Sequence, residues 1–125
     1  MNTIFTIGHS VRAISEFLQI LQKNEIDTLV DVRTFPKSRF CPQYNQKALS
    51  DELSKAYITY IFKGKNLGGR GENIDYDKTI NGVMELVYWG KRVCVMCSER
   101  DYKKCHRHTV LESSFIKGGL KITHL

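Results

Sequence analysis

The sequence has no long hydrophobic run, and this absence excludes a large class of proteins. No apolar stretch among its 125 residues approaches the roughly 20 residues that a membrane-spanning helix needs, so no membrane partner is expected. The first residues, MNTIFTIGHS, lack both a basic segment and a cleavage site, so no signal peptide is expected. Linkers, repeats and low-complexity blocks are also missing, and the length predicts one domain over residues 1–125.

Cysteine is present, but not in the pattern of a disulfide scaffold. The four cysteines are unevenly spaced and follow no export signal, which predicts thiols in a reducing cytoplasm. Structural zinc sites usually show two compact pairs of ligands. A set made of Cys97, Cys105 and His106, with Cys41 or His9 as the fourth ligand, does not follow that spacing. We therefore predict neither a metal nor another cofactor.

Positive charge is what the chain has in excess. Its 19 Lys and Arg residues outnumber 13 Asp and Glu residues, which gives a net charge of +6 and a pI near 9.2. A basic protein favours anionic partners such as nucleic acids, nucleotides or phosphorylated metabolites. No polybasic tail narrows that choice, and nothing in the sequence indicates an oligomeric state.

Hydrophobic patterning alternates between strands and helices along the whole chain. Short runs of β-branched and aromatic residues predict five strands, at residues 3–7, 28–32, 57–62, 93–96 and 121–124. Apolar residues at helical spacing predict four helices, at residues 13–24, 46–56, 75–89 and 105–117. This β-α-β alternation indicates parallel strands joined by right-handed crossovers. We predict a three-layer α/β domain with a mostly parallel sheet, loosely like rhodaneses or flavodoxins.

Chemically versatile residues follow the predicted strands at their carboxyl ends. They are His9, Ser10, Asp31, Arg33, the LGG segment at residues 67–69, Cys97 and Glu99. In open parallel sheets, ligands bind outside the carboxyl ends of the strands. We therefore expect these residues to meet on one rim and to form a site there.

Cys97 is the candidate nucleophile. It ends a predicted strand and precedes a helix, where backbone N–H groups and nearby cations at Arg100, Lys103, Lys104 and Arg107 stabilise a thiolate. Rhodaneses and cysteine phosphatases have a loop that runs from Cys through five residues to Arg. Here the sixth residue after Cys97 is Lys103, so that signature is not met. The alternative is that Cys97 is a small core residue.

Cys94 and Cys97 form a C-x-x-C pair, a pattern typical of metal or redox sites. Positions three apart on a strand point to opposite faces of the sheet. We therefore expect Cys94 to lie in the core.

Four further residues suit proton transfer or anion binding. His106 and Arg107 open the last predicted helix, where free N–H groups bind anions, although Arg107 has a structural alternative in pairing with Glu99 or Asp31. His9 is a candidate general acid or base, or it hydrogen-bonds a carbonyl to fix its turn. Glu99 is the best-placed carboxylate for proton transfer.

Two loops add possible contacts to an anionic ligand. Residues 33–45 interleave cations with aromatic rings, which suits nucleobase stacking and phosphate contact, although the rings can equally pack inward. Residues 63–73, KGKNLGGRGEN, lack the order of a phosphate-binding P-loop. We expect them to form a flexible basic loop that can act as a mobile lid over an anion.

Together the motifs carry a family resemblance. TIGHS (residues 6–10), LVDVR with P-x-S (residues 29–38), LGG (residues 67–69), and MCSE followed by CHR (residues 96–107) resemble domain-of-unknown-function family 488 over nearly the full length. The resemblance implies a compact α/β domain but no established activity. Cys41-Pro42 departs from the pattern. The resemblance implies that these motif residues cluster: His9, Ser10, Asp31, Arg33, Pro36, Ser38, Gly68, Gly69, Cys97, Glu99, Cys105, His106 and Arg107.

We predict an enzyme acting on a phosphate-bearing substrate, a nucleotide or a nucleic acid. The expected catalytic residues are His9, Cys97 and Glu99. The expected substrate or anion ligands are Ser10, Arg33, Ser38, Gly68, Gly69, His106 and Arg107, with Asp31 and Cys105 supporting them. Two alternatives stay open: a non-catalytic nucleic-acid-binding module, and a sulfur-transfer or redox protein that depends on Cys97.

Overall fold

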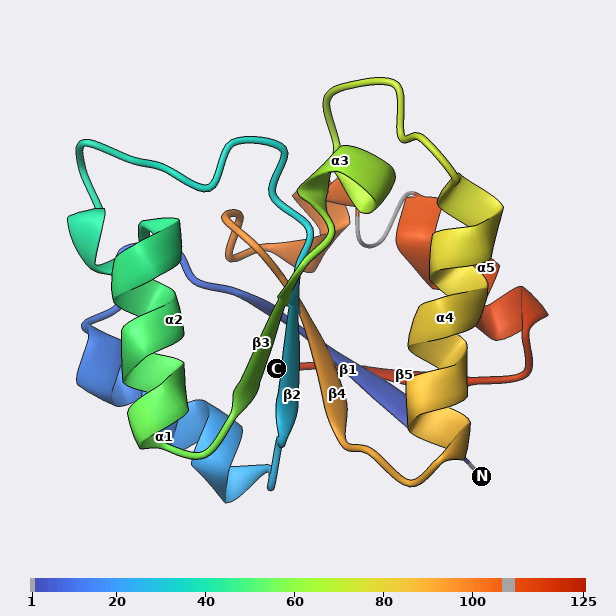
Figure 1. Ribbon diagram of the computed structural model, residues 1–125, viewed down its shortest axis with the longest axis horizontal. Helices are drawn as coiled ribbons and strands as arrows, with labels where there is room; N and C mark the ends of the chain where they lie inside the picture. The colour runs from blue at the N-terminus through green and yellow to red at the C-terminus, as the bar shows by residue number, and fades with distance from the viewer. Residues whose placement is uncertain (1, 107–109) are drawn as a thin grey trace.

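The computed structural model describes residues 2–106 and 110–125 (Figure 1). Within these residues five strands form one sheet in the order β3-β2-β4-β1-β5, and every neighbouring pair is parallel. The strands are β1 (Thr3–Gly8), β2 (Thr28–Asp31), β3 (Thr59–Phe62), β4 (Val93–Cys97) and β5 (Lys121–His124). The α/β fold and its parallel sheet are confirmed, while the strand order does not follow from the sequence pattern.

The third strand begins later than the pattern predicts. β3 starts at Thr59 instead of residue 57, because Tyr57 has a φ of 59°, a left-handed conformation that cannot continue a strand. The Tyr57 side chain is exposed and packs on neither face of the sheet. Tyr57 therefore turns the chain out of the preceding helix rather than opening the strand.

The helices are α1 (Ile14–Lys23), α2 (Gln46–Lys55), α3 (Gly64–Leu67), α4 (Tyr76–Tyr88) and α5 (Glu112–Lys117). The described residues thus hold five helices where the sequence predicts four, because the short α3 forms in the glycine-rich segment. The sequence predicts the last helix over residues 105–117. A 3-10 turn, η2 (Tyr102–Lys104), precedes Cys105, His106 is helical, and α5 begins at Glu112, while residues 107–109 lie outside the described residues. None of the described helices is both long and apolar enough to span a membrane.

Two hydrophobic cores lie on the two faces of the sheet. Figure 1 shows α1 and α2 covering one face and α4 and α5 covering the other. The central strand β4 contributes alternate residues to each core: Val93, Val95 and Cys97 to the α4–α5 side, and Cys94 and Met96 to the α1–α2 side. The predicted burial of Cys94 on the face opposite Cys97 is therefore confirmed.

Because all strands run parallel, their carboxyl ends meet at one edge of the sheet, at the top of Figure 1. The segments that follow β1, β2, β3 and β4 rise from this edge. They carry the chemically versatile residues of the chain, so the topology brings together side chains that lie far apart in sequence.

Candidate active site at the carboxyl edge of the sheet

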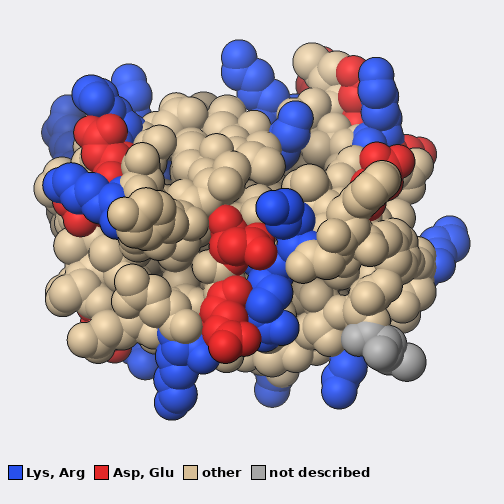
Figure 2. Space-filling model, turned by 60° about the horizontal axis from the view of Figure 1, so that its bottom comes forward, with Lys and Arg blue, Asp and Glu red and all other residues tan. Residues whose placement is uncertain are grey.

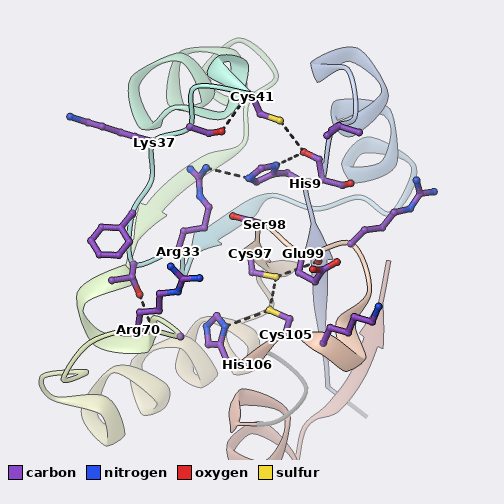
Figure 3. A pocket seen from close by; sticks show the side chains of 18 residues that line it. His9, Arg33, Lys37, Cys41, Arg70, Cys97, Ser98, Glu99, Cys105 and His106 are labelled. Carbon is purple, nitrogen blue, oxygen red and sulfur yellow. Dashed lines mark hydrogen bonds between the residues drawn. The ribbon is translucent and has the colours of Figure 1, made fainter.

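A pocket of about 730 Å³ opens at this edge (Figure 3). Its walls come from the segments after β1, β2 and β4 and from the end of α3. The residues that line it are His9, Ser10, Val11, Arg33, Thr34, Phe35, Lys37, Ser38, Cys41, Gly69, Arg70, Cys97, Ser98, Glu99, Arg100, Lys104, Cys105 and His106. Most of the residues expected on the rim thus line one cavity. Arg107 lies outside the described residues.

A charged cluster, which we define as Asp31, Arg33, His9 and Tyr60, adjoins the pocket, and of its members His9 and Arg33 line the pocket. The Arg33 side chain donates two hydrogen bonds to Asp31, from Nε to Oδ1 (2.9 Å) and from Nη2 to Oδ2 (2.7 Å). The Arg33 backbone N–H also donates to Oδ1 (3.0 Å), and the Tyr60 hydroxyl donates to Oδ2 (2.7 Å). Asp31 and Arg33 are both buried, at 0% and 5% exposure. The carboxylate behind the pocket therefore holds the Arg33 guanidinium in one orientation.

The same cluster shapes the chemistry of Tyr60. Burial raises the pKa of Tyr60, and its hydrogen bond to Asp31 raises it further. The hydroxyl therefore stays protonated and keeps donating to the carboxylate across the ordinary pH range. Sequence patterning gives no sign of this contact, because Tyr60 lies 29 residues away on the neighbouring strand.

His9 joins the charged cluster through its ring nitrogens. Its Nδ1 donates to the backbone carbonyl of Ser10 (2.7 Å), so Nε2 carries the lone pair and accepts a hydrogen bond from Arg33 Nη1 (3.4 Å). The ring stacks on Tyr44 with centroids 4.2 Å apart. Burial lowers the pKa of His9, and the Arg33 charge lowers it further. His9 is therefore neutral near pH 7, and it bonds a carbonyl while lining the pocket.

Tyr44 is a supporting residue whose burial the sequence pattern does not reveal. The sequence leaves open whether the rings of this loop stack on bases or pack inward. Tyr44 is fully buried, and its hydroxyl donates to the Arg12 carbonyl (2.8 Å). Burial raises the pKa of Tyr44 to about 12. Of the three rings in that loop, Phe35 and Phe40 are exposed and Tyr44 is not, so the inward-packing alternative holds for one ring only.

The other part of the pocket is a thiol cluster, which we define as Cys97, Cys105 and His106. The two Sγ atoms lie 2.7 Å apart, and both side chains are buried at the floor of the pocket (Figure 3). His106 Nε2 donates to the Leu67 carbonyl (2.8 Å), which leaves the lone pair on Nδ1, 3.5 Å from Cys105 Sγ. The thiol next to a base is therefore Cys105, for which the sequence predicts only a supporting role.

Ser38 and Glu99 also line the pocket, in different ways. The Ser38 hydroxyl accepts the backbone N–H groups of Phe40 and Cys41, both at 3.1 Å, so it stabilises the turn of its own loop. Glu99 is exposed, and the Asp101 backbone N–H donates to its Oε1 (3.3 Å). Among the described residues that line the pocket, Glu99 is the single carboxylate.

The first part of the glycine-rich segment packs closely against the rim of the pocket. A Cβ at Gly68 would lie 2.2 Å from Thr34 Oγ1, and Leu67 is fully buried, so this part of the chain sits tightly against the rim. Gly68 does not line the pocket, and its role as an anion ligand stays a prediction. Gly69 does line it, where a Cβ would lie 3.0 Å from His106 Nδ1. Residues 64–69 are thus packed against the rim in this structure, and the role of a mobile lid over an anion stays a prediction.

Charge distinguishes this edge of the sheet from the opposite one. The cations that line the pocket are Arg33, Lys37, Arg70, Arg100 and Lys104. Figure 2 brings the opposite end of the molecule forward and shows acidic side chains next to basic ones on that face. In the described chain, no group of three or more His, Cys, Asp or Glu residues is placed to hold a metal ion.

A family match covers the middle of this site. The model of the family described as "Domain of unknown function DUF488" matches residues 13–79, more than half of the chain. The match includes Asp31, Arg33, Ser38 and Gly69, while His9 and the thiol cluster lie outside it. No curated protein and no solved structure matches the chain.

Proposed function

The chain belongs to the DUF488 family, and from its site we propose that it is an enzyme acting on a phosphate-bearing substrate, either a nucleotide or a nucleic acid. The observation that carries the proposal is the charge of the pocket. Five cationic side chains of the described residues line a cavity in which Glu99 is the one described carboxylate. A cavity of about 730 Å³ has room for a nucleotide-sized ligand.

Arg33 is the cation best prepared to hold a phosphoryl oxygen. A guanidinium has five N–H donors, and within the described residues Asp31 and His9 engage three of those of Arg33. Two donors are left for a ligand, on a group that is already immobilised. Because folding has already fixed its side chain, Arg33 loses little conformational entropy on binding. The exposed cations Lys37 and Arg70 then add electrostatic attraction to the ligand.

Exposed rings beside the cations favour a substrate that carries a base. Phe35 lines the pocket with 67% of its surface exposed, and Phe40 is 94% exposed in the same loop. Stacking of a base on an aromatic ring contributes about 1–3 kcal/mol. A sugar phosphate or inorganic phosphate would make no use of these rings, so they support a nucleotide or a single-stranded nucleic acid.

Glu99 is the first candidate for proton transfer. It lines the pocket from the loop after β4 and is exposed, so a substrate hydroxyl or a water can reach it. His9 is the second candidate: burial keeps it neutral, and a substrate that displaces the hydrogen bond from Arg33 Nη1 would reach its Nε2 lone pair. In this mechanism Arg33 and the lysines stabilise the anionic oxygens, Glu99 accepts or donates the proton, and Cys97 lines the floor.

Binding is the first test. Fluorescence anisotropy with a labelled mononucleotide and with labelled single-stranded DNA and RNA, over a range of salt concentrations, measures affinity and its salt slope. Removing one phosphate contact with Arg70→Ala should weaken binding and reduce the slope by about one. Lys47→Ala is the matched control, because Lys47 pairs with Asp51 on the exposed surface of α2. Equal effects of the two changes would contradict the pocket as the binding site.

Turnover separates the enzyme from a non-catalytic binding module. Glu99→Gln keeps the shape of the side chain, so affinity should stay unchanged while turnover falls by about 10²–10⁴-fold. Glu85→Gln, an exposed position on α4, is the control. If the wild-type protein binds the ligands but converts none of them, the module is the correct function. If Glu99→Gln retains full turnover, the proton-transfer role is wrong.

A further inference from the structure

The thiol cluster carries chemistry that the proposed function does not use. Cys97 comes at the end of β4 and Cys105 follows η2, yet their sulfur atoms lie 2.7 Å apart (Figure 3). A disulfide bond length is about 2.05 Å. The remaining gap closes with less than an ångström of side-chain movement, so the fold has already brought these two thiols together.

The two thiols differ in their neighbours. Cys97 Sγ donates to the Glu99 carbonyl (3.6 Å), an acceptor that cannot take the proton away. Cys105 Sγ donates to Cys97 Sγ (2.7 Å) and also lies 3.5 Å from His106 Nδ1, whose lone pair is oriented by the bond from Nε2 to the Leu67 carbonyl. Cys105 therefore has a base at hand, and it is the more exposed thiol, at 7% against 3% for Cys97.

The other two cysteines provide an internal comparison. Cys94 is fully buried in the core on the opposite face of the sheet. Cys41 lines the same pocket, but its Sγ contacts the backbone carbonyl of Ser10 (3.6 Å) on the side of His9. Of the four cysteines, all in the described residues, the pair of Cys97 and Cys105 has both a sulfur partner and an imidazole.

We propose that Cys97 and Cys105 form a thiol–disulfide exchange site for an anionic low-molecular-weight disulfide, with Cys105 as the attacking thiol, Cys97 as the resolving thiol and His106 as the base. The negative charge of the substrate is inferred from Arg100 and Lys104, which line the same pocket. This inference stands apart from the proposed function, since it requires no phosphate-bearing ligand.

The exchange proceeds in two balanced steps. His106 Nδ1 takes the proton of Cys105, and the thiolate attacks one sulfur of the external disulfide RS–SR. That S–S bond breaks, a mixed disulfide forms on Cys105, and the departing thiolate takes the proton from His106. Cys97 then attacks Cys105 Sγ, the mixed disulfide breaks, and the second RS⁻ leaves with the proton of Cys97. The protein loses two electrons and two protons, and RS–SR becomes two RSH.

Oxidised glutathione is a suitable probe, because it is an anionic disulfide. The reduced protein is incubated with it, quenched with acid, alkylated and digested, and the peptides are identified by mass spectrometry. We expect a crosslink between Cys97 and Cys105, with Cys41 and Cys94 left open to alkylation after unfolding. A glutathione adduct or crosslink at Cys41 or Cys94 instead, or no oxidation at all, would overturn the proposal. This mapping uses only the wild-type chain, so it does not depend on whether a variant folds.

Variants assign the order of the two thiols. Cys97→Ser should accumulate glutathione on Cys105, because the resolving thiol is gone, while Cys105→Ser should leave Cys97 mostly unmodified. Cys41→Ser is the matched control from the same pocket and should form the crosslink at the wild-type rate. Faster adduct formation in Cys105→Ser than in Cys97→Ser would reverse the assigned roles and overturn the proposal as stated.

Two rate measurements test the base and the charge preference. His106→Gln should slow exchange at neutral pH, and a rise in pH should restore the rate, because solvent then removes the Cys105 proton. A rate that stays low at every pH would indicate a packing role instead. Cystamine, a cationic disulfide, should react more slowly than oxidised glutathione at low salt. An equal or faster rate with cystamine would show that the cations do not select the substrate.

Discussion

His9 and His106 both line the pocket, yet they hold opposite tautomers. In His9 the Nδ1–H donates to the carbonyl of Ser10, and Nε2 accepts from Arg33. In His106 the Nε2–H donates to the carbonyl of Leu67, and Nδ1 faces Cys105. A backbone carbonyl thus selects the tautomer in both cases. What differs is the neighbour left for the lone pair, a guanidinium in one cluster and a thiol in the other.

The charged cluster and the thiol cluster also differ in the free energy that it costs to bury them. A buried charge is expensive in a medium of low dielectric constant unless an opposite charge and hydrogen bonds compensate for it. Asp31 accepts four hydrogen bonds from the described residues, and these bonds hold the charged cluster together. A thiol is a weak hydrogen-bonding group and is buried at little cost. The neutral thiol cluster can therefore be buried without a compensating charge.

The charged cluster should be the more important of the two for stability. Asp31→Asn removes the charge that compensates buried Arg33, and breaking such a pair costs about 3–5 kcal/mol. Urea denaturation followed by circular dichroism measures the loss. The control is Asp51→Asn, because the exposed pair of Asp51 with Lys47 contributes at most about 1 kcal/mol. If Asp31→Asn lost as little free energy of unfolding as Asp51→Asn, the charged cluster would contribute no more to stability than an exposed ion pair.

Matched changes at the two histidines sharpen the contrast. His9→Asn should cost about 1–3 kcal/mol of stability, since it gives up the stacking on Tyr44 and leaves buried hydrogen-bonding groups of Arg33 and Ser10 unsatisfied. His106→Asn should cost less, because its ring is only partly buried and faces neutral groups. Urea midpoints report stability, and the alkylation rate of Cys105 reports reactivity. If His106→Asn proves the more destabilising change, the assignment of the two roles is wrong.

A smaller effect is expected in the pH dependence of folding. The pKa of His9 in the folded state lies below its ordinary value of 6.5, so the unfolded chain binds more protons between the two values. The stability that His9 contributes is complete above about pH 6.5 and is lost as pH falls toward the folded-state pKa, at no more than about 1.4 kcal/mol per pH unit. Urea denaturation at several pH values measures the free energy of unfolding. Between pH 7.5 and pH 5 this free energy should therefore fall less steeply for His9→Asn than for the wild type. Equal slopes would show that His9 does not titrate with folding.

Much of the site can be predicted from the sequence because it depends on short-range spacing and on the periodicity of single strands. Asp31 and Arg33 are two residues apart, so their proximity needs no knowledge of the fold. The period-2 alternation of β4 is enough to put Cys94 and Cys97 on opposite faces of the sheet. The predicted placement of His9, Arg33, Cys97 and Glu99 on one rim follows from parallel topology. The periodicity of burial and the short-range spacing of residues can be read directly from the sequence.

Other features depend on the three-dimensional packing. The strand order β3-β2-β4-β1-β5 results from competition among similar apolar strands, and no local pattern encodes it. The helix α3 escapes prediction because glycines at positions 64 and 68 indicate a loop, whereas here they allow close approach to Arg33 and Thr34. The burial of Tyr44 escapes prediction because an aromatic residue in a basic loop has no periodicity to show which way it faces.

Patterning and composition are enough to predict the α/β architecture, the edge of the sheet at which the pocket opens and the cationic character of its lining. They do not predict the contact of His106 with the Leu67 carbonyl, 39 residues away, or that of Cys105 with Cys97 across the end of the sheet. The reason is physical. Hydrophobic periodicity and charge are summed along the chain, whereas tautomers and sulfur–sulfur contacts are set by single atoms that folding brings within hydrogen-bonding distance.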